Sequence, residues 1–269
     1  MMNRSAVSDF LSGFDETYYP KAFTEKYELL ECLSSGQAGE TLLVRDVFHN
    51  CFIAKCYTES SLLSRSTETE LLASLHHEGL PAFVEEFRSE SMVCVVRRYA
   101  NGVPLNRLQT RPTERQTVSI GLQLCGILGY LHRRTPPVIH RDIKPQNVIL
   151  GEDGTVTLID FGISRRYDAS ARTDTVFFGT QEFAPPEQYG FAQTDCRADI
   201  YSLGCTLYVM ITGKPPFEGK TAVEVLTKHA TAPVVPPDVI VKRVPKTLSA
   251  ILTKMLAKKP DERYQDMGE

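Results

Sequence analysis

Short apolar runs separated by polar turn residues occupy the chain from about residue 27 to residue 98. This pattern predicts several short strands. One stretch in the same region, Ser64–Leu75, instead places leucines at helical intervals near its end and predicts a helix. The predicted strands are Glu28–Cys32, Thr41–Asp46, Phe52–Tyr57 and Met92–Arg98.

The pattern becomes helical after the turn dipeptide Asn101-Gly102. Thr113–Leu131 is predicted as a long buried helix, because apolar residues recur in it at helical intervals. We therefore expect an α+β fold, with a β-rich lobe at 27–100, a helical lobe at 101–269, and residues 1–26 as an extension with a short helix around Val7–Phe14. The apolar positions of the long helix are Val118, Leu122, Leu128 and Leu131, and later helices are predicted at Asp199–Thr212, Thr221–Thr231 and Leu248–Leu256.

The composition of the chain disfavours nucleic-acid-binding, metal-knuckle and membrane-spanning proteins. The 269 residues carry a formal charge of −3, which gives no bulk attraction to nucleic acid or to a membrane surface. The seven cysteines include no C-x-x-C pair, which disfavours a metal knuckle and suits a reducing compartment. No apolar run approaches the roughly 20 residues of a transmembrane helix. We expect a cytoplasmic location, no nucleic-acid partner and no membrane segment in this chain.

Two polar motifs in the second half of the chain suggest phosphate chemistry. Phosphoryl transfer needs positioning and charge neutralisation more than covalent catalysis. In the loop His140–Asn147, the side chains of Asp142, Lys144 and Asn147 could point into one cleft. Further along, Asp160 follows a predicted strand and precedes Phe161-Gly162, where a carboxylate is suited to holding Mg²⁺ against phosphate oxygens.

These motifs, H-R-D-x-K-x-x-N followed by D-F-G, resemble the signature pair of protein kinases. The resemblance extends over about 27–269 and implies the bilobal protein kinase fold, with ATP and Mg²⁺ as cofactors. It implies that Asp142 orients the substrate hydroxyl or accepts its proton, and that Lys144 contacts the γ-phosphate. It also implies that Asn147 and Asp160 bind magnesium. The lysine two residues after Asp142 is similar to the serine/threonine branch.

The resemblance also implies a glycine-bearing hairpin over the phosphates, because only a bare backbone approaches them closely. The segment 33–41 occupies that place. It departs from the family pattern twice, with Ser34 in place of the first glycine and Thr41 in place of the valine that packs on adenine. The hairpin residues assigned to nucleotide binding are Leu33, Ser34, Gly36, Gly39 and Thr41.

The segment Phe52-Ile53-Ala54-Lys55 resembles the V-A-I-K motif, so Lys55 is expected to contact the α- and β-phosphates. Its partner is predicted to be Glu68 rather than Glu70, because two residues along a helix are about 200° apart and both cannot face Lys55. The nucleotide-binding residues implied outside the hairpin are Ala54, Lys55, Glu68, Arg98, Ala100 and Ile149.

The same register places Arg97 at the gatekeeper position, where an unpaired buried charge would be costly. Two interpretations remain open at this point. In one, Arg97 reaches towards Glu68 or another acid and biases the Lys55–Glu68 pair. In the other, the register is slipped by one residue and both Arg97 and Arg98 lie in solvent.

The segment after Asp160 is similar to a kinase activation segment. It ends in Gly179–Glu187, which resembles G-T-x-x-Y-x-A-P-E with Phe183 and Pro185 as substitutions. By this resemblance Thr180 contacts the catalytic residues and forms part of the substrate platform, Glu187 pairs with Arg263, and Asp199 braces the catalytic loop. Autophosphorylation is predicted at Thr173 or Thr175, because a phosphate there could pair with Arg141.

The predicted function is therefore that of a serine/threonine protein kinase similar to the bacterial eukaryotic-like (Hanks-type) kinases. It would act on protein substrates and form a transient homodimer for autophosphorylation. The alternative is a nucleotide-binding pseudokinase scaffold, favoured by the altered hairpin and by Arg97. A small-molecule phosphotransferase is disfavoured, because a small substrate needs no peptide platform.

Overall fold

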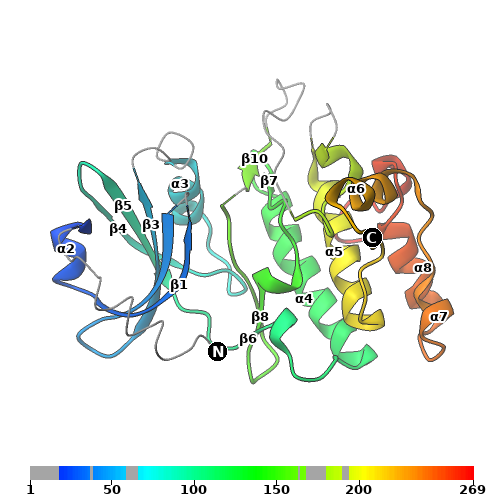
Figure 1. The fold of residues 1–269 in the computed structure, drawn as a ribbon, viewed down its shortest axis with the longest axis horizontal. Helices are drawn as coiled ribbons and strands as arrows, with labels where there is room; N and C mark the ends of the chain where they lie inside the picture. Colours follow the sequence, from blue (N-terminus) through cyan, green and yellow to red (C-terminus); the bar gives the residue numbers. More distant parts are fainter. Residues whose placement is uncertain (1–17, 37–38, 59–65, 163, 168–179, 190–193) are drawn as a thin grey trace. The chain divides into compact units, whose positions relative to one another are not determined.

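Two groups of elements make up the chain in the computed structural model, which describes residues 18–36, 39–58, 66–162, 164–167, 180–189 and 194–269. The first unit contains the residues up to His76 together with Pro81–Ala100. The second contains His77–Leu80 and Asn101–Glu269. Figure 1 labels the elements of both units.

A five-stranded antiparallel sheet forms the first unit, with strand order β1-β2-β3-β5-β4. Four of these strands were predicted. The strand β4 was missed because its central residues, Glu85 and Glu86, interrupt the apolar pattern on which the prediction depended. The strands are β1 (Glu28–Gly36), β2 (Gly39–Arg45), β3 (Cys51–Thr58), β4 (Phe83–Arg88) and β5 (Met92–Arg98).

The two faces of this sheet bury different sets of side chains, as the alternation of a strand requires. One face, called here the outer face, packs against Tyr19, Phe23 and Tyr27 from the segment before β1. The opposite face, called here the inner face, carries the apolar cluster of Tyr57, Val93, Val95 and Phe83. The sheet residues buried on the outer face are Leu42, Val44, Phe52, Ala54, Cys56, Met92, Cys94 and Val96.

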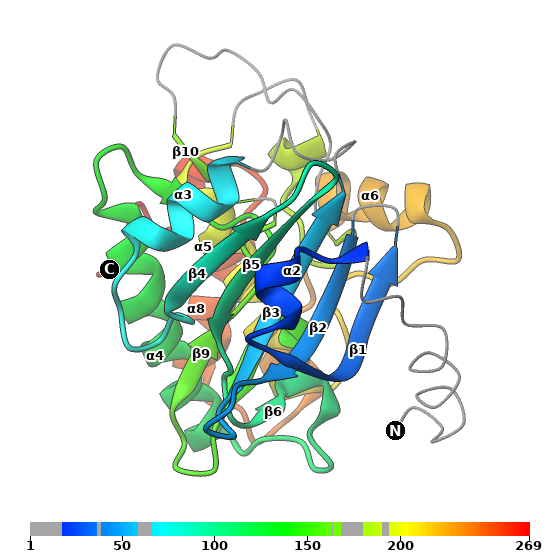
Figure 2. The same ribbon diagram turned by 90° about the vertical axis from the view of Figure 1, so that its left-hand side faces the viewer.

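Two helices accompany the sheet, α2 (Lys21–Thr24) and α3 (Ser66–Ser74). Figure 2 shows α2 lying across the sheet. Residues 1–26 were predicted as an extension before the kinase domain, and two of them, Tyr19 and Phe23, are buried in the core of the first unit. The short helix predicted around Val7–Phe14 lies outside the described residues.

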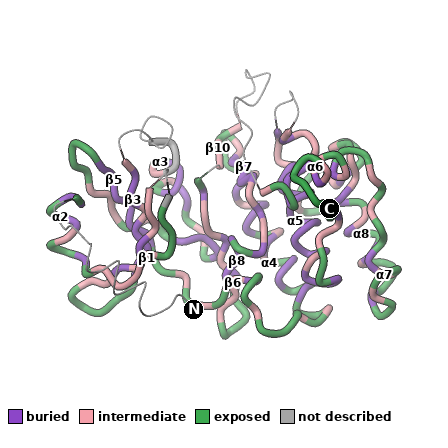
Figure 3. Tube along the Cα trace, in the orientation of Figure 1, coloured by how far each residue is buried: buried purple, intermediate pink, exposed green. Residues whose placement is uncertain are grey.

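Helices dominate the second unit, together with a three-stranded sheet of order β6-β8-β9 and the strand pair β7 and β10. The helix α5 contacts both α4 and α8, and its residues are buried over most of its length (Figure 3). The helices are α4 (Glu114–His132), α5 (Cys196–Thr212), α6 (Ala222–Thr231), α7 (Pro237–Ile240) and α8 (Lys246–Met255). The strands are β6 (Val103–Pro104), β7 (Val138–Ile139), β8 (Val148–Leu150), β9 (Val156–Leu158) and β10 (Arg165–Arg166).

The long helix α4 was predicted correctly, but part of its buried face was not. A capping box between Thr113 and Gln116 starts the helix. Leu122 is 68% exposed and Val118 is 38% exposed, so both lie outside the core. The buried stripe includes the predicted Leu128 and Leu131, together with Thr117, Ile120, Gly121, Leu124 and Ile127.

The segment His77–Leu80 was predicted as part of the β-rich lobe, but it packs with the second unit. The amide of Leu158 in β9 donates a hydrogen bond to the Gly79 carbonyl at 2.9 Å. The His77 ring lies 5.1 Å from the ring of Tyr130 in α4. A Cβ atom at Gly79 would lie 2.4 Å from the end of the Ile127 side chain, so a larger residue there would require that side chain to move.

No helix in the described ranges is long and apolar enough to cross a membrane.

Candidate active site

A buried carboxylate from α5 holds the loop that follows β7. The Oδ2 atom of Asp199 accepts the His140 amide hydrogen at 2.9 Å, and Oδ1 accepts that of Arg141 at 2.8 Å. His132 Nε2 lies 2.8 Å from the same Oδ2. Burial raises the pKa of Asp199, but the hydrogen bond and charge of His132 and the amide of His140 outweigh it, and the pKa lies below its usual range. The predicted role of Asp199 as a brace for this loop is confirmed.

The residue before Asp142 has a strained backbone. Arg141 has a φ of 68°, a conformation that is uncommon for residues other than glycine. Three contacts hold the backbone there: the two amide bonds to Asp199, and a bond from Gln188 Nε2 to the Arg141 carbonyl at 3.1 Å. The loop therefore presents the next residue, Asp142, from a fixed backbone.

Asp142, Lys144, Asn147 and Thr180 form one polar cluster. Lys144 Nζ lies 2.7 Å from Asp142 Oδ2, and it donates a hydrogen bond to Thr180 Oγ1 at 2.6 Å. The Thr180 hydroxyl donates to Asp142 Oδ1 at 3.0 Å. Asn147 Nδ2 donates to the Asp142 carbonyl and to its Oδ2, both at 2.9 Å. The structure thus brings together four residues that the sequence analysis assigned to catalysis, to metal binding and to the substrate platform.

His140 is a structural member of this loop. Its ring is fully buried and lies 4.9 Å from the ring of Phe161 in an edge-on arrangement. The Asp142 amide donates to His140 Nδ1 at 3.4 Å. Burial lowers the pKa of His140, which keeps the imidazole neutral and its Nδ1 able to accept that hydrogen bond.

Asp160 lies beyond β9, in a segment tied to the catalytic loop. The amide of Ile159 donates to the Asn147 carbonyl at 2.8 Å. Asp160 itself has a φ of 69°, and its Oδ1 accepts the Gly162 amide hydrogen at 3.2 Å. A direct backbone bond therefore links the two segments that carry Asn147 and Asp160.

The oxygen atoms of Asn147 and Asp160 fit the chemistry of Mg²⁺. Because the Asn147 amide nitrogen bonds to Asp142, the oxygen of that amide is the atom suited to a cation. Within the described ranges, no cluster of three or more His, Cys, Asp and Glu could hold a metal ion by itself. One carboxylate and one amide oxygen suit Mg²⁺, which usually takes few protein ligands and completes its shell with phosphate oxygens and water.

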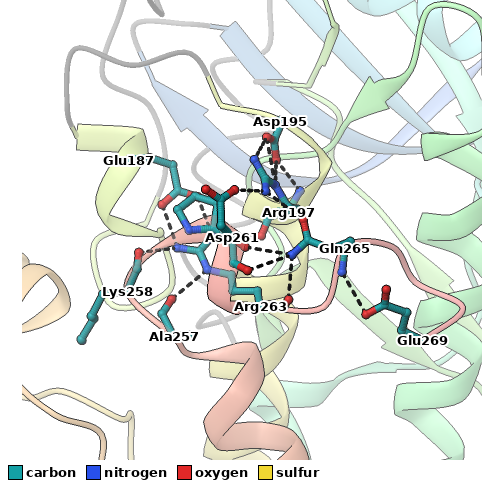
Figure 4. A network of polar contacts seen from close by, with 10 residues as sticks. Glu187, Asp195, Arg197, Ala257, Lys258, Asp261, Arg263, Gln265 and Glu269 are labelled. Atoms are coloured by element: carbon teal, nitrogen blue, oxygen red, sulfur yellow. Dashed lines mark hydrogen bonds and ion pairs between the residues drawn. The ribbon is translucent and has the colours of Figure 1, made fainter.

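The end of the activation segment is fixed by a buried ion pair. Arg263 Nη1 and Nη2 lie 2.6 Å and 2.8 Å from the two carboxylate oxygens of Glu187, which confirms the predicted pair. Arg263 also donates to the carbonyls of Ala257, Lys258 and Arg197, so its donors meet acceptors on several sides (Figure 4). The Arg263 side chain is fully buried, with the Tyr201 ring 4.7 Å from its guanidinium carbon.

A second arginine supports the same region. Arg197 in the first turn of α5 contacts Asp195, which caps that helix, and Asp261 in the segment before Arg263. It also donates to the Gln265 side chain at 2.9 Å (Figure 4). Neither Arg197 nor Asp195 matches a catalytic motif, so neither was predicted from the sequence.

In the first unit, the strand register places the predicted phosphate contacts in one row. Ser34 pairs with Thr41, Thr41 with Lys55, and Lys55 with Val95. Residues directly opposite each other share a face of the sheet, so all four belong to the inner face. Gly39 closes the hairpin with a φ of 118°, and a side chain there would lie 2.1 Å from the Cys56 carbonyl oxygen. Only glycine fits that position.

Ala54 does not belong to this row. It is fully buried in the core of the outer face, whereas Lys55 belongs to the inner face. The expectation that Ala54 contacts the nucleotide beside Lys55 is therefore wrong. Ile53, two residues before Lys55, shares the inner face with it. The alternation of β3 could have identified Ile53 from the sequence.

Arg97 is 5% exposed and lies opposite Ile53, on the inner face. The interpretation that Arg97 lies in solvent is therefore wrong, whereas its neighbour Arg98 is exposed. Within the described ranges, Arg97 Nε and Nη1 have no hydrogen-bond partner. The Arg98 amide donates to the Ala82 carbonyl at 2.9 Å, so this amide is already paired within the protein.

The other residues named in the sequence predictions take no part in the contacts described so far. Glu70 in α3 is exposed, as expected for the residue that does not face Lys55. The side chain of Glu68, and Thr173 and Thr175, lie outside the described residues. Ile149 is buried in β8.

Comparison with known proteins shows that residues 27–267 match the protein kinase domain family. The serine/threonine-protein kinase PknB of Mycobacterium tuberculosis (strain H37Rv) is 30% identical over 267 residues, and the match covers 93% of this chain and 42% of that protein. The protein of the same name from Mycolicibacterium smegmatis is 32% identical with the same coverage. A probable serine/threonine-protein kinase, CPE1738 of Clostridium perfringens, is 31% identical over 262 residues and is covered to 38%. The chain thus spans about two fifths of the length of these relatives.

Proposed function

Because the chain belongs to the protein kinase family, we propose that it transfers the γ-phosphate of ATP to serine or threonine hydroxyls of protein substrates. The observation that carries this proposal is the triangle of Asp142, Lys144 and Thr180, with its three contacts of 2.7, 2.6 and 3.0 Å. A carboxylate that accepts a hydroxyl hydrogen bond beside a cation is the arrangement that a phosphoryl acceptor requires.

The chemistry follows from these contacts. Asp142 Oδ1, which accepts from the Thr180 hydroxyl, orients the substrate hydroxyl in the same manner and receives its proton. The substrate oxygen forms a bond to the γ-phosphorus, and the bond from that phosphorus to the bridging oxygen of ADP breaks. ADP leaves with that electron pair. Lys144 supplies positive charge for the transferred group, and Mg²⁺ held by Asn147 and Asp160 would neutralise the phosphate oxygens.

The proposed nucleotide site includes the hairpin residues and the inner-face row of the first unit. Ile53 replaces Ala54 in this set, because Ile53 shares the inner face with Lys55 and Ala54 is buried on the outer face. Glu68 is proposed as the partner of Lys55, and the Arg98 carbonyl and the Ala100 backbone as contacts of the base. The remaining members are Leu33, Ser34, Gly36, Gly39, Thr41 and Ile149.

Regulation by phosphorylation is part of the same proposal. Thr173 and Thr175 are the proposed acceptors, and a transient homodimer would bring one chain's segment to another chain's Asp142. A phosphate adds nearly two negative charges, which Arg141 could pair. Phosphosite mapping of enzyme expressed with and without an inactivating substitution tests this step, and a fully active enzyme without phosphate on either threonine would contradict it.

A pseudokinase scaffold remains the second candidate, and one observation favours it. Arg97 places a buried cation on the inner face, where family members have an apolar residue or threonine. The two candidates differ in turnover rather than in nucleotide binding. ADP release in the presence of ATP, Mg²⁺ and a serine- and threonine-containing peptide mixture distinguishes them.

Lys144→Met is expected to lower kcat by about 10²–10³-fold, because it removes one preorganised charge from the transferred phosphoryl group. The KM for ATP should stay within a few-fold of the wild-type value. Steady-state ADP release measures both constants. The matched control is Lys228→Met, since Lys228 pairs with Glu224 on the surface of α6 and is 41% exposed. An unchanged kcat for Lys144→Met would exclude the proposed role of this lysine.

A further inference from the structure

We infer that the segment before β1 positions the phosphate-binding hairpin, and that Tyr19 is the residue through which it acts. This inference rests on the proposed function, because it assigns a role to the hairpin in ATP binding. It adds a positioning residue from outside the region that matches the protein kinase family, which begins at residue 27.

The segment is firmly attached to the outer face. Tyr19, Phe23 and Tyr27 are each at most 6% exposed. Their rings form a continuous row, with centroids 6.1 Å apart between Tyr19 and Phe23 and 5.7 Å apart between Phe23 and Tyr27. Phe23 also contacts Phe87 of β4 at 5.7 Å, and Tyr27 contacts Phe52 of β3 at 5.4 Å. The far end of this row, Tyr19, is thereby fixed relative to the sheet.

Tyr19 reaches the hairpin through a carboxylate. Its hydroxyl donates a hydrogen bond to Glu40 Oε2. The other oxygen, Glu40 Oε1, accepts from the Ser35 hydroxyl at 3.3 Å. Ser35 and Glu40 are register partners in β1 and β2, next to the hairpin turn. One carboxylate therefore connects the segment to both strands of the hairpin.

The hairpin contacts the Tyr19–Glu40–Ser35 link, called here the brace, on one face and the proposed ATP site on the other. Ser35 and Glu40 belong to the outer face, in the row of Cys56 and Cys94. Ser34 and Thr41, their immediate neighbours, belong to the inner face with Lys55. Because successive residues share one backbone, a bond that fixes Ser35 and Glu40 also fixes the backbone that presents Ser34 and Thr41.

The brace also fixes the position of the negative charge of Glu40 beside the proposed phosphate site. Glu40 follows Gly39 directly, and a free carboxylate at that position would repel phosphate oxygens. The Tyr19 hydroxyl holds this carboxylate on the face opposite Lys55. Burial, followed by the hydrogen bond and the charge of Glu40, raises the pKa of Tyr19, so its hydroxyl remains a donor at physiological pH. A hairpin whose backbone is already fixed loses less conformational entropy when ATP binds, which favours binding.

The test compares two tyrosines of the same segment. Tyr19→Phe removes the hydroxyl on Glu40 and keeps the ring. Tyr27→Phe removes an equivalent bond, since the Tyr27 hydroxyl donates to Glu85 Oε1 at 2.6 Å, but Glu85 lies in β4, away from the hairpin strands. The two residues are 6% and 5% exposed, so the loss of a buried hydroxyl is matched.

Tyr19→Phe is expected to raise the KM for ATP about 3- to 10-fold, in line with the loss of one typical hydrogen bond, and to leave kcat within about twofold. Tyr27→Phe should leave both constants unchanged. In the nucleotide-free protein, the backbone amides of residues 33–42 should exchange with deuterium faster in Tyr19→Phe than in Tyr27→Phe. Adding Glu40→Gln to Tyr19→Phe should bring the KM for ATP part of the way back, because it removes the negative charge of the released carboxylate, while residues 33–42 should still exchange fast.

Other outcomes would overturn either the positioning role of Tyr19 or the proposed function. Equal exchange of residues 33–42 in the two variants overturns the inference, and so does a KM for ATP that rises equally in both. If the wild-type chain neither binds nor turns over ATP, the proposed function fails, while the exchange comparison still decides whether Tyr19 fixes the hairpin. If the wild-type chain is active and Tyr19→Phe has the wild-type KM and exchange, only the positioning role is lost.

Discussion

Asp142→Asn is expected to lower kcat for phosphoryl transfer by about 10²–10⁴-fold, the usual contribution of general acid–base catalysis. The carboxylate accepts hydrogen bonds from Thr180 and Asn147 and an ion-pair contact from Lys144. An amide of the same shape keeps one acceptor oxygen but cannot take the substrate proton. It also carries no negative charge to balance Lys144.

The measurement is single-turnover label transfer from ATP to peptide, together with nucleotide affinity by calorimetry. ATP affinity should change by no more than a few-fold, because Asp142 is not among the proposed nucleotide ligands. Asp153→Asn is the control, since Asp153 is an exposed turn carboxylate that accepts from Thr155. Transfer by Asp142→Asn at the rate of Asp153→Asn would contradict the assigned role.

Arg263→Met is expected to lower the free energy of unfolding by about 3–5 kcal/mol, the typical cost of breaking a buried ion pair from one side. The substitution leaves the Glu187 carboxylate, which is 12% exposed, without its cation. It also removes the donor from the carbonyls of Ala257, Lys258 and Arg197. Methionine retains much of the apolar volume, so the effect reports the polar contacts.

Thermal and urea unfolding measure this loss, which corresponds to roughly 2–4 °C in Tm for each kcal/mol in a domain of this size. The control is Lys259→Met in the same segment, because the Lys259–Glu262 pair is 3.8 Å apart with side chains 79% and 58% exposed. Such a surface pair contributes about 0–1 kcal/mol. Equal Tm values for the two variants would show that the buried pair does not stabilise the domain.

The catalytic loop could be predicted from the sequence because its chemistry is local. Asp142, Lys144 and Asn147 lie within six residues, so the identities and spacing of the side chains already define the cluster. Thr180 required the family resemblance, since it comes from a segment 36 residues beyond Lys144. Glu187 and Arg263 likewise needed the resemblance, because no local pattern joins residues 76 positions apart.

Positions that depend on register or on the helical face were predicted less well. Ala54 and Ile53 are adjacent in β3, and a shift of one residue exchanges the two faces of a strand. In α4, Val118 and Leu122 are apolar but lie off the buried stripe, because exposed apolar residues are common on protein surfaces. The spacing of apolar residues alone did not show which helical face other elements would cover.

The contribution of the amino-terminal segment was missed for a different reason. Tyr19 and Phe23 occur among polar residues without a strand or helix period, so they gave no signal of a buried element. Their burial depends on an outer sheet face that needs cover, and this becomes visible only when the strands are assembled. Glu40 was likewise inconspicuous, since its role depends on Tyr19.

We propose that this chain is an active serine/threonine kinase rather than a scaffold. The most direct measurement is incubation of the wild-type chain with γ-labelled ATP, Mg²⁺ and a protein or peptide mixture, followed by phosphoamino-acid analysis. We expect label on serine and threonine and none on tyrosine, with transfer abolished by Asp142→Asn. Bound nucleotide without any transferred label, or label that persists in Asp142→Asn, would contradict it.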